Sequence, residues 1–340
     1  MNQKQSGNNG GHMQKVTILG FDLALSSAIT GIMDILSMAG VTWNFWQHQP
    51  TTPRFQVQLA SVDGGPVRCL NKMQLEAHTR FDQVDSDHIL VVPTIAGDID
   101  VTLERNPELI ETLYFFGSRG SLVVGNCTGV FLLAEAGLLN GKTATTHWAY
   151  VEQFKQRYPK VDLRPEQMIT TAENVYCSGG GIAWLDMALY LTERFCGHDM
   201  AVRTSKSFVI DMGRTYQSSY SALRVRKMHR DEDILNVQNW LEEHCQEEIR
   251  IDDLAQRFNM SPRTLARRFK AATGDTPLGY LQTLRLENAK KLLEETSDNI
   301  SQITMAVGYE DVSSFTKLFR QKTGLTPKDY RNKFQRRSLM

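Results

Sequence analysis

An internal repeat in the last third of the chain constrains the fold more than any other feature of the sequence. Residues 269–280 (FKAATGDTPLGY) and residues 319–330 (FRQKTGLTPKDY) begin fifty residues apart and share Phe, a basic residue, Thr-Gly, Thr-Pro and Tyr at identical offsets. Agreement at so many fixed offsets indicates two copies of one supersecondary unit. The chain is therefore expected to end in a domain built from two similar parts.

The first copy follows a helix–turn–helix pattern. Apolar residues at helical spacing over residues 251–258 predict a short helix, Asn259 supports a turn, and Ser261-Pro262 supply an N-cap and a first helical residue. Four basic residues and no acidic residue lie between Ser261 and Lys270. Backbone phosphates provide sequence-independent affinity, and Arg reads guanine edges, so this composition predicts a DNA recognition helix. Its predicted DNA-contacting residues are Arg263, Thr264, Arg267, Arg268 and Lys270.

The second copy repeats this arrangement. Residues 300–307 predict its first helix, Gly308 its turn, and Phe315 and Phe319 the buried side of its second helix. Residues 278–293 predict one long helix that holds the two recognition helices apart, for reading two major-groove segments roughly 34 Å apart. The residues of the second copy predicted to contact DNA are Ser313, Ser314, Thr316, Lys317 and Arg320.

Taken together, residues 251–334 resemble the DNA-binding domain of the AraC/XylS family of transcription regulators. The resemblance rests on Ser-Pro-Arg-Thr-Leu before the first repeated Phe and on the repeated Thr-Gly and Thr-Pro pairs. It implies a sequence-specific regulator of double-stranded promoter DNA, a homodimer formed through an N-terminal domain, and activation by contact with RNA polymerase. It also suggests a small nitrogenous metabolite, such as an amino acid or a betaine-like compound, as effector.

The composition limits the alternatives. The formal net charge is zero, so DNA binding must depend on a local basic surface. Five cysteines without a CxxC pair argue against a disulfide framework and a zinc site, and we expect neither a metal nor another cofactor. Residues 1–14 predict a disordered tail. Neither a signal peptide nor a run of 18 apolar residues occurs, so we expect a cytoplasmic protein without a membrane span.

The first two thirds of the chain alternate between strand and helix patterns. Short apolar or β-branched runs at residues 15–20, 54–61, 88–93 and 121–126 are separated by helical patterns such as residues 26–39 and 107–116. This alternation predicts an α/β domain with a mostly parallel sheet that helices cover on both faces. The C-terminal domain, in contrast, is expected to be all-α.

One segment of the α/β domain has the form of a nucleophile elbow. A buried strand runs into Gly125-Asn126-Cys127-Thr128-Gly129 and then into a helical pattern. Small flanking residues permit a strained turn that displays the central side chain at the sheet edge. A helix N-terminus lowers a thiol pKa and offers N–H groups to an anion, so Cys127 would suit either a nucleophile or an anionic ligand group.

With Thr145-Thr146-His147-Trp148, this elbow resembles the DJ-1/PfpI branch of the class I glutamine amidotransferase-like fold, over about residues 16–195. The resemblance implies a flavodoxin-like sheet and a glutamate facing the cysteine in enzymes. Ala28 stands near the glutamate position, and residues 93–95 replace a Gly-rich turn, so we predict a binding domain rather than an enzyme. The predicted ligand pocket contains Asp22, Thr94, Cys127, Thr128 and His147.

These observations define a domain plan with open alternatives. We expect a DJ-1/PfpI-like sensor and dimerisation domain at residues 15–210, a linker at residues 211–230 and a double helix-turn-helix domain at residues 231–340. One alternative is a cysteine-dependent hydrolase or glyoxalase-type enzyme tethered to DNA, in which Asp22 replaces the missing glutamate. Another is a redox sensor in which Cys127 forms a sulfenic acid.

Overall fold

The structure is a computed structural model that describes residues 13–220 and 229–335 of the 340-residue chain. It divides into two compact units, Met1–Gln217 and Ser218–Met340, which we describe separately. Most of the expected tail, residues 1–12, and the central part of the expected linker, residues 221–228, lie outside the described residues. Gln14 was assigned to the tail but is the first residue of a strand.

The first unit is built around a seven-stranded sheet with the order β10-β11-β7-β6-β1-β2-β5. Only the β10–β11 pair is antiparallel. The buried strands β1, β6 and β7 are largely apolar, as expected for a sheet covered on both faces. The strands are β1 Gln14–Leu19, β2 Phe55–Ser61, β5 Thr79–Arg80, β6 Ile89–Val92, β7 Val123–Asn126, β10 Ile169–Ala172 and β11 Val175–Ser178.

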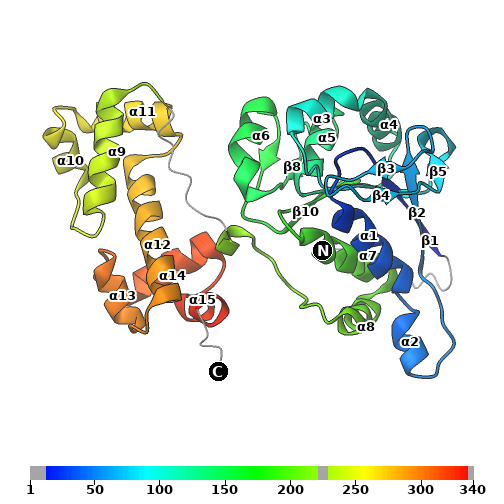
Figure 1. The fold of residues 1–340 in the computed structure, drawn as a ribbon. Coiled ribbons are helices and arrows are strands. Elements are labelled where there is room, and N and C mark those ends of the chain that lie inside the picture. Colours follow the sequence, from blue (N-terminus) through cyan, green and yellow to red (C-terminus); the bar gives the residue numbers. More distant parts are fainter. Residues whose placement is uncertain (1–12, 221–228, 336–340) are drawn as a thin grey trace, which may run out of the picture. The chain divides into compact units, whose positions relative to one another are not determined.

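Helices cover both faces of this sheet, so the predicted α/β class is confirmed (Figure 1). Helices α1 and α7 pack together, and α3 and α4 both contact α5. The helices are α1 Ser26–Met38, α2 Thr42–Trp46, α3 Ile99–Arg105, α4 Pro107–Ser118, α5 Val130–Glu135, α6 Val151–Arg157, α7 Ala183–Cys196 and α8 His198–Phe208. The short elements are η1 Phe81–Gln83, η2 Cys127–Gly129, η3 Trp148–Tyr150 and the pairs β3 Val67–Arg68 with β4 Gln74–Leu75 and β8 Thr143–Ala144 with β9 Asp162–Leu163.

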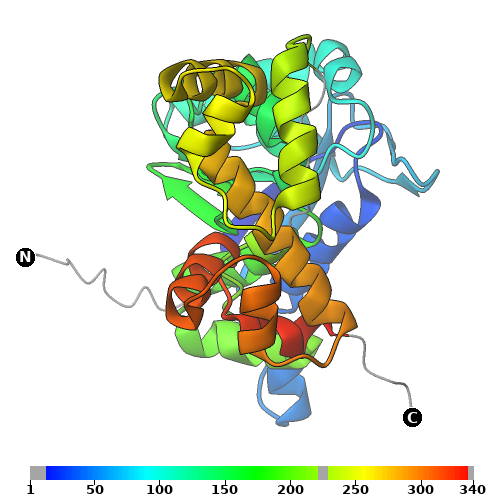
Figure 2. The same cartoon turned by 90° about the vertical axis from the view of Figure 1, so that its left-hand side faces the viewer.

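The second unit is helical. Its long central helix, α12, runs from one helix group to the other (Figure 2). Two separate apolar clusters form, one around Leu265 and Phe269 and one around Phe315 and Phe319. Its helices are η4 Ser218–Tyr220, α9 Glu232–His244, α10 Ile251–Arg257, α11 Pro262–Thr273, α12 Pro277–Glu295, α13 Ile300–Ala306, α14 Val312–Thr323 and α15 Pro327–Phe334.

The repeated Thr-Gly pair ends each second helix. Gly274 follows α11 with φ 81°, and Gly324 follows α14 with φ 80°, a left-handed conformation that favours glycine. The preceding threonines, Thr273 and Thr323, donate their buried hydroxyls to the carbonyl of the repeated phenylalanine, at 2.7 and 2.8 Å. The repeat therefore encodes one helix-terminating turn, used twice.

The repeated Thr-Pro and Tyr residues start the helix that follows this turn. The hydroxyls of Thr276 and Thr326 each accept a hydrogen bond, at 3.1 Å, from the backbone N–H three residues later. The hydroxyls of Tyr280 and Tyr330 donate to a glutamate oxygen at 2.8 and 2.6 Å. None of the helices in the described parts of the chain is long and apolar enough to span a membrane.

Candidate functional site

The exposed side of α11 carries the basic residues that the sequence assigned to DNA. Leu265 and Phe269 are fully buried, which turns Arg263, Arg267 and Lys270 outward. Thr264 is half-buried, and its hydroxyl lies 2.8 Å from that of Ser261. The Ser261 hydroxyl also accepts a hydrogen bond from the Thr264 N–H at 3.1 Å and so caps the helix.

Arg268 has different surroundings. Its Nε and Nη2 atoms donate to the two carboxylate oxygens of Asp231 at 3.0 and 2.5 Å, and Nη2 lies 2.9 Å from Asp233. These hydrogen bonds lower the pKa of Asp231. Asp231 is also the N-cap of α9, because its carboxylate accepts from the Ile234 N–H. Arg268 therefore joins the start of α9 to α11, an intramolecular contact that the sequence did not predict.

The predicted second recognition helix, α14, is arranged like α11. Phe315 and Phe319 are buried, and the side chains of Lys317 and Arg320 are exposed. Ser313 and Ser314 are also exposed, and Thr316 is half-buried. All five DNA-contacting residues predicted in the second copy thus lie on α14.

In the first unit, Cys127 lies in the sharp turn between β7 and α5. Its φ is 55°, a left-handed backbone conformation that is uncommon for a residue with a side chain. Gly129 is required two residues later, because a Cβ there would lie 2.2 Å from the Pro93 carbonyl oxygen. The structure has the strained strand–turn–helix geometry expected of a nucleophile elbow.

The surroundings of the Cys127 thiol differ from the expectation. The residue is only 4% exposed, and burial raises the pKa of the thiol. Hydrogen bonds from the backbone of Gly181 and Thr128, and from the side chains of Thr128 and Thr94, lower this pKa without reversing the shift. The prediction that the helix N-terminus lowers the thiol pKa is wrong, because desolvation of the thiolate is the larger effect.

Four of the five predicted pocket residues lie around this turn. The Thr128 hydroxyl donates to the Ile95 carbonyl at 2.7 Å, and Thr94 is close enough to influence the pKa of the Cys127 thiol. The His147 ring packs against the 179–181 loop, since a Cβ at Gly180 would lie 2.2 Å from its Cδ2 atom. His147 Nδ1 accepts from the Ala149 N–H at 3.0 Å.

Asp22, the fifth predicted pocket residue, lines a cavity to which Cys127 does not contribute. Its carboxylate accepts from the Arg68 N–H at 3.0 Å and lies 3.6 Å from the Arg68 guanidinium. The cavity, of about 860 Å³, is lined by residues that include Arg68 and Cys69 but not Cys127. This placement gives Asp22 no role as the missing acid beside Cys127.

Gln217 is a neighbour of the Cys127 turn that the sequence analysis did not identify. It is 2% exposed, and its side-chain amide donates to the Thr146 carbonyl at 2.8 Å and accepts from the Gly180 N–H at 2.9 Å. Thr146 in turn donates its hydroxyl to the Cys127 carbonyl at 2.8 Å. A polar residue in a stretch rich in Ser, Gln and Tyr carries no sequence signal of such burial.

Gln217 belongs to a segment, residues 211–217, that the sequence assigned to the linker. The structure places this segment on the first unit. The Thr215 carbonyl accepts from the Met168 N–H, and the Gln217 N–H donates to the Glu166 carbonyl, both at 2.9 Å. The linker therefore begins later than the sequence indicated. The sequence could not show this, because irregular hydrogen bonding leaves no periodic pattern of residues.

Within the described residues, Asp85, Asp87 and His88 form the one group spaced to hold a metal ion. Lys15 Nζ lies 3.2 Å from Asp87 and 3.7 Å from Asp85, so an ammonium group already balances these carboxylates. His88 Nδ1 is hydrogen-bonded to Thr17 Oγ1 at 2.6 Å. The cluster is explained as an ion-pair network beside the central strands β1 and β6.

Comparison with known proteins defines the class of this chain. A DJ-1/PfpI family model matches residues 36–194, and a helix-turn-helix domain model matches residues 254–333. A THiJ/PfpI family protein from Pseudomonas syringae has the fold of the first unit, with a TM-score of 0.51, 15% identity, and coverage of 66% of this chain and 86% of that one. The chain thus joins a DJ-1/PfpI domain to a helix-turn-helix domain.

Relatives with curated names share this combination over most of their length. The HTH-type transcriptional regulator CdhR of Pseudomonas aeruginosa is 29% identical over 275 residues, which cover 80% of each chain. The HTH-type transcriptional regulator GlxA of Rhizobium meliloti is 25% identical over 284 residues, 83% of this chain and 86% of GlxA. The chain thus carries a DJ-1/PfpI domain and an AraC-type helix-turn-helix domain, and it is similar over most of its length to AraC-family transcriptional regulators.

Proposed function

We propose that this regulator reads two successive major-groove segments of promoter DNA with α11 and α14. The observation that supports this proposal is the position of their exposed basic residues, on two helices that pack at opposite ends of α12. The 19 residues of α12 span about 28 Å at 1.5 Å per residue, close to the roughly 34 Å of one DNA turn.

The test starts from DNA that the full-length protein selects from a random pool. Fluorescence anisotropy on the selected sequence is expected to show that Arg267→Ala raises Kd by about 5- to 150-fold, because a bidentate Arg–guanine contact is worth roughly 1–3 kcal/mol. Lys328→Ala is the matched control, since Lys328 is exposed on α15, outside both recognition helices. Unaltered binding by Arg267→Ala would remove the recognition-helix assignment.

We further infer that the first unit is the sensor and dimerisation domain and that the protein is a cytoplasmic activator that contacts RNA polymerase. The domain combination of the family supports these roles.

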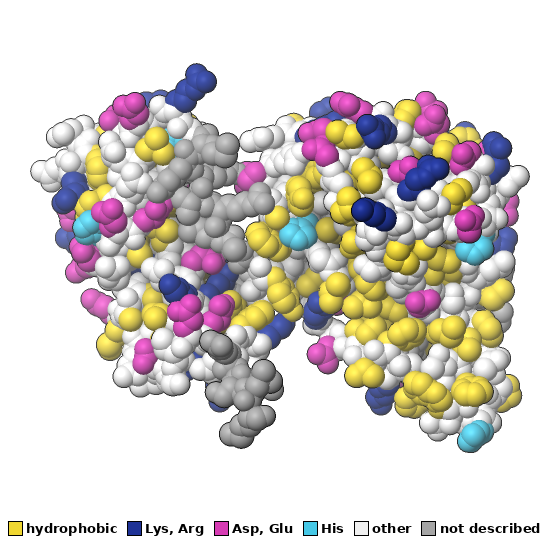
Figure 3. All heavy atoms as spheres, in the orientation of Figure 1, with side chains coloured by type: hydrophobic (Ala, Val, Ile, Leu, Met, Phe, Trp, Pro, Cys, Tyr) yellow, Lys and Arg dark blue, Asp and Glu magenta, His cyan; other side chains and the backbone are white. Residues whose placement is uncertain are grey.

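Exposed apolar side chains gather on one face of the first unit (Figure 3), and Phe45 and Trp46 on α2 are 69% and 52% exposed. An apolar patch of this kind suits a subunit interface. Analytical ultracentrifugation of Phe45→Asp beside the wild type tests the homodimer.

We infer that the effector is a small nitrogenous metabolite held near Thr94, Cys127, Thr128 and His147. Regulation requires that the effector bind two states of the first unit unequally, because equal affinity shifts no equilibrium. Gln217 supports a route to the DNA-binding unit, since its side chain contacts the loops around Cys127 and its backbone precedes Ser218.

The Cys127 thiol acts here as a pocket residue and not as a nucleophile. This proposal rests on the burial that raises the pKa of the thiol and on the position of Asp22 in another cavity. A thermal-shift screen of wild type and Cys127→Ala against amino acids, quaternary amines and 2-oxoaldehydes, with product analysis, tests it. Stabilisation without turnover is expected. Turnover that disappears in Cys127→Ala would establish an enzyme, and peroxide-sensitive DNA binding lost in the same variant would establish a redox sensor.

A further inference from the structure

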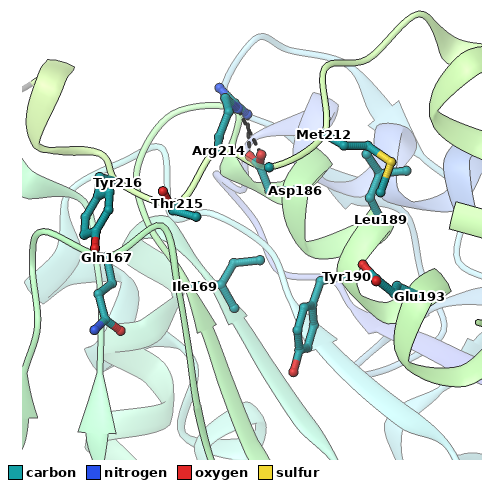
Figure 4. Close-up of a pocket in the computed structure, with 11 residues that line it drawn as sticks. Gln167, Ile169, Asp186, Leu189, Tyr190, Glu193, Met212, Arg214, Thr215 and Tyr216 are labelled. Atoms are coloured by element: carbon teal, nitrogen blue, oxygen red, sulfur yellow. Dashed lines mark hydrogen bonds and ion pairs between the residues drawn. The ribbon is translucent and has the colours of Figure 1, made fainter. Parts of the chain in front are cut away.

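A cavity of about 380 Å³ lies in the first unit between β10, α7 and the segment 212–216. Its volume falls in the range of small-molecule sites. Cys127, Thr94, Thr128 and His147 are absent from its lining, so it is separate from the predicted effector pocket. Ile169 and Leu189 give it an apolar floor, and Figure 4 shows Ile169 between the side chains of Tyr216 and Tyr190, with Met212 beside Leu189.

The charged residues that line the cavity favour a ligand with a positive charge. Asp186 and Glu193 contribute two carboxylates, and Arg214 contributes one guanidinium. Arg214 Nε donates to Asp186 Oδ1 at 2.9 Å, and its Nη2 pairs with Oδ2, so this guanidinium is already balanced. Asp186 is 7% exposed and lies in the first turn of α7, where the helix dipole stabilises its charge. The other carboxylate, on Glu193, is hydrogen-bonded through Oε1 to His198 Nδ1 at 2.9 Å, and His198 is not among the lining residues. The lining itself therefore contributes two carboxylates and one guanidinium.

We propose that this cavity binds a small organic cation, an ammonium or guanidinium group on a short apolar chain. The apolar floor accepts the chain, and Glu193 with the neighbouring ring of Tyr190 attracts the cationic group. A carboxylate ligand would instead lie beside Asp186 and Glu193 and would have to displace Asp186 from Arg214.

The bound cation stabilises the docked state of the segment 212–217. Met212, Arg214 and Tyr216 come from this segment, whereas the floor and α7 belong to the body of the unit. A ligand that contacts both parts binds the docked segment better than an undocked one and shifts the equilibrium toward it. Because the segment leads directly into Ser218, the occupied cavity would restrict the start of the second unit.

The test uses the full-length protein without DNA, so its failure would leave the DNA-binding proposal intact. The cationic probes are pentylammonium, pentylguanidinium and benzyltrimethylammonium, and pentanoate and 1-pentanol are the chain-matched anion and neutral compound. At about 100 times Kd, a cation is expected to raise the melting temperature of the first unit by about 5–10 °C. At about 10 times Kd, hydrogen exchange of peptides spanning residues 212–217 is expected to slow about tenfold.

Two variants locate the site. Ile169→Phe fills the cavity and is expected to abolish cation binding, and Glu193→Gln removes the excess carboxylate and is expected to weaken it several-fold. Glu193 is 47% exposed, so its variant should fold. Glu111→Gln, on the exposed surface of α4, is the matched control and should bind like the wild type. The proposal is overturned if no cationic probe binds, if pentanoate binds as well as the cations, or if Glu193→Gln and Ile169→Phe both bind like the wild type.

Discussion

Arg267 and Arg268 are neighbours in the sequence, but the fold gives them different partners. Arg267 is exposed on α11. Arg268 is half-buried and forms ion pairs with Asp231, the N-cap of α9, and with Asp233 in α9. An arginine fork that engages a carboxylate with two hydrogen bonds has a fixed orientation. The contact of Arg268 therefore positions the recognition helix, and the side chain of Arg267 remains available to bases.

We predict that Arg268→Ala lowers the melting temperature of the second unit, because Asp231 and Asp233 lose their common cation. Its folded form should lose less DNA affinity than Arg267→Ala does. Differential scanning fluorimetry and anisotropy titrations on the same preparations measure both quantities. Asp231→Asn should reproduce the loss of thermal stability, since it removes the charge from the same pair. If Arg268→Ala left the melting temperature unchanged and lowered DNA affinity about tenfold, Arg268 would instead be a DNA-contacting residue.

Cys127 shows how local geometry and chemical reactivity can diverge at one residue. Its positive φ and the absence of space for a Cβ at Gly129 reproduce the elbow of an enzyme. The same tight packing excludes water from the sulfur and disfavours the thiolate. A strained turn therefore does not by itself create a nucleophile.

At the scale of elements, the two recognition helices depend on their capping residues. The Ser261 hydroxyl accepts from the Thr264 N–H and so satisfies one of the backbone donors at the start of α11. Asp311 does the same for α14, with a 2.6 Å hydrogen bond from the Ser314 N–H. The helix starts are thus fixed by side chains that adjoin the predicted DNA surface.

Removal of the first cap gives a prediction for α11. Ser261→Ala should lower the free energy of unfolding of the second unit by about 1 kcal/mol, the usual cost of a lost N-cap. Urea unfolding followed by circular dichroism measures the change. Ser261→Asn keeps an acceptor at this position and should recover most of the loss; an Asn variant as unstable as the Ala variant would show that the cap contributes little.

Helix α12 connects two cores rather than crossing one. Leu281 and Leu284 pack with the α10–α11 cluster, and Ala289 and Leu293 pack with the α13–α14 cluster. Each cluster surrounds one recognition helix. The continuous backbone of α12 therefore sets the distance between α11 and α14, the two helices proposed to read DNA, while each cluster fixes the orientation of its own helix.

At the scale of the whole molecule, burial of the cysteines makes stability depend on alkaline pH. Burial raises the pKa of all five thiols, and it raises the pKa of Cys177 from 9.0 to about 12. Below about pH 9, these thiols are protonated in both the folded and the unfolded chain. Above it, the unfolded chain releases its protons first, so the free energy of unfolding falls as pH rises toward the folded pKa values.

We predict that urea midpoints of the first unit decrease from about pH 8 to about pH 10.5, with Cys177 contributing a slope of up to about 1.4 kcal/mol per pH unit above about pH 9. Fluorescence-monitored unfolding across this range measures the slope. Cys177→Ala lacks the buried thiol and should show a shallower decrease than the wild type. Parallel curves for the two proteins would contradict the prediction.

Much of the fold was predictable because it depends on local patterns. The four predicted strands, β1, β2, β6 and β7, were placed within two residues at both ends, and α1 and α4 began at the expected residues. The repeat predicted both helix-turn-helix units, since Thr-Gly and Thr-Pro act within a few residues of each other. The candidate DNA surface followed from the same helical spacing, apart from the ion pairs of Arg268.

The sequence by itself determined the two classes of unit, the position of the elbow and the faces of both recognition helices, because caps, turns and apolar periodicity act over short distances along the chain. Only the tertiary structure decided that Arg268 binds Asp231, that Asp22 lies apart from Cys127 and that residues 211–217 dock on the first unit. Ion pairing and desolvation depend on groups far apart in the sequence, and their partners are selected only when the chain is packed.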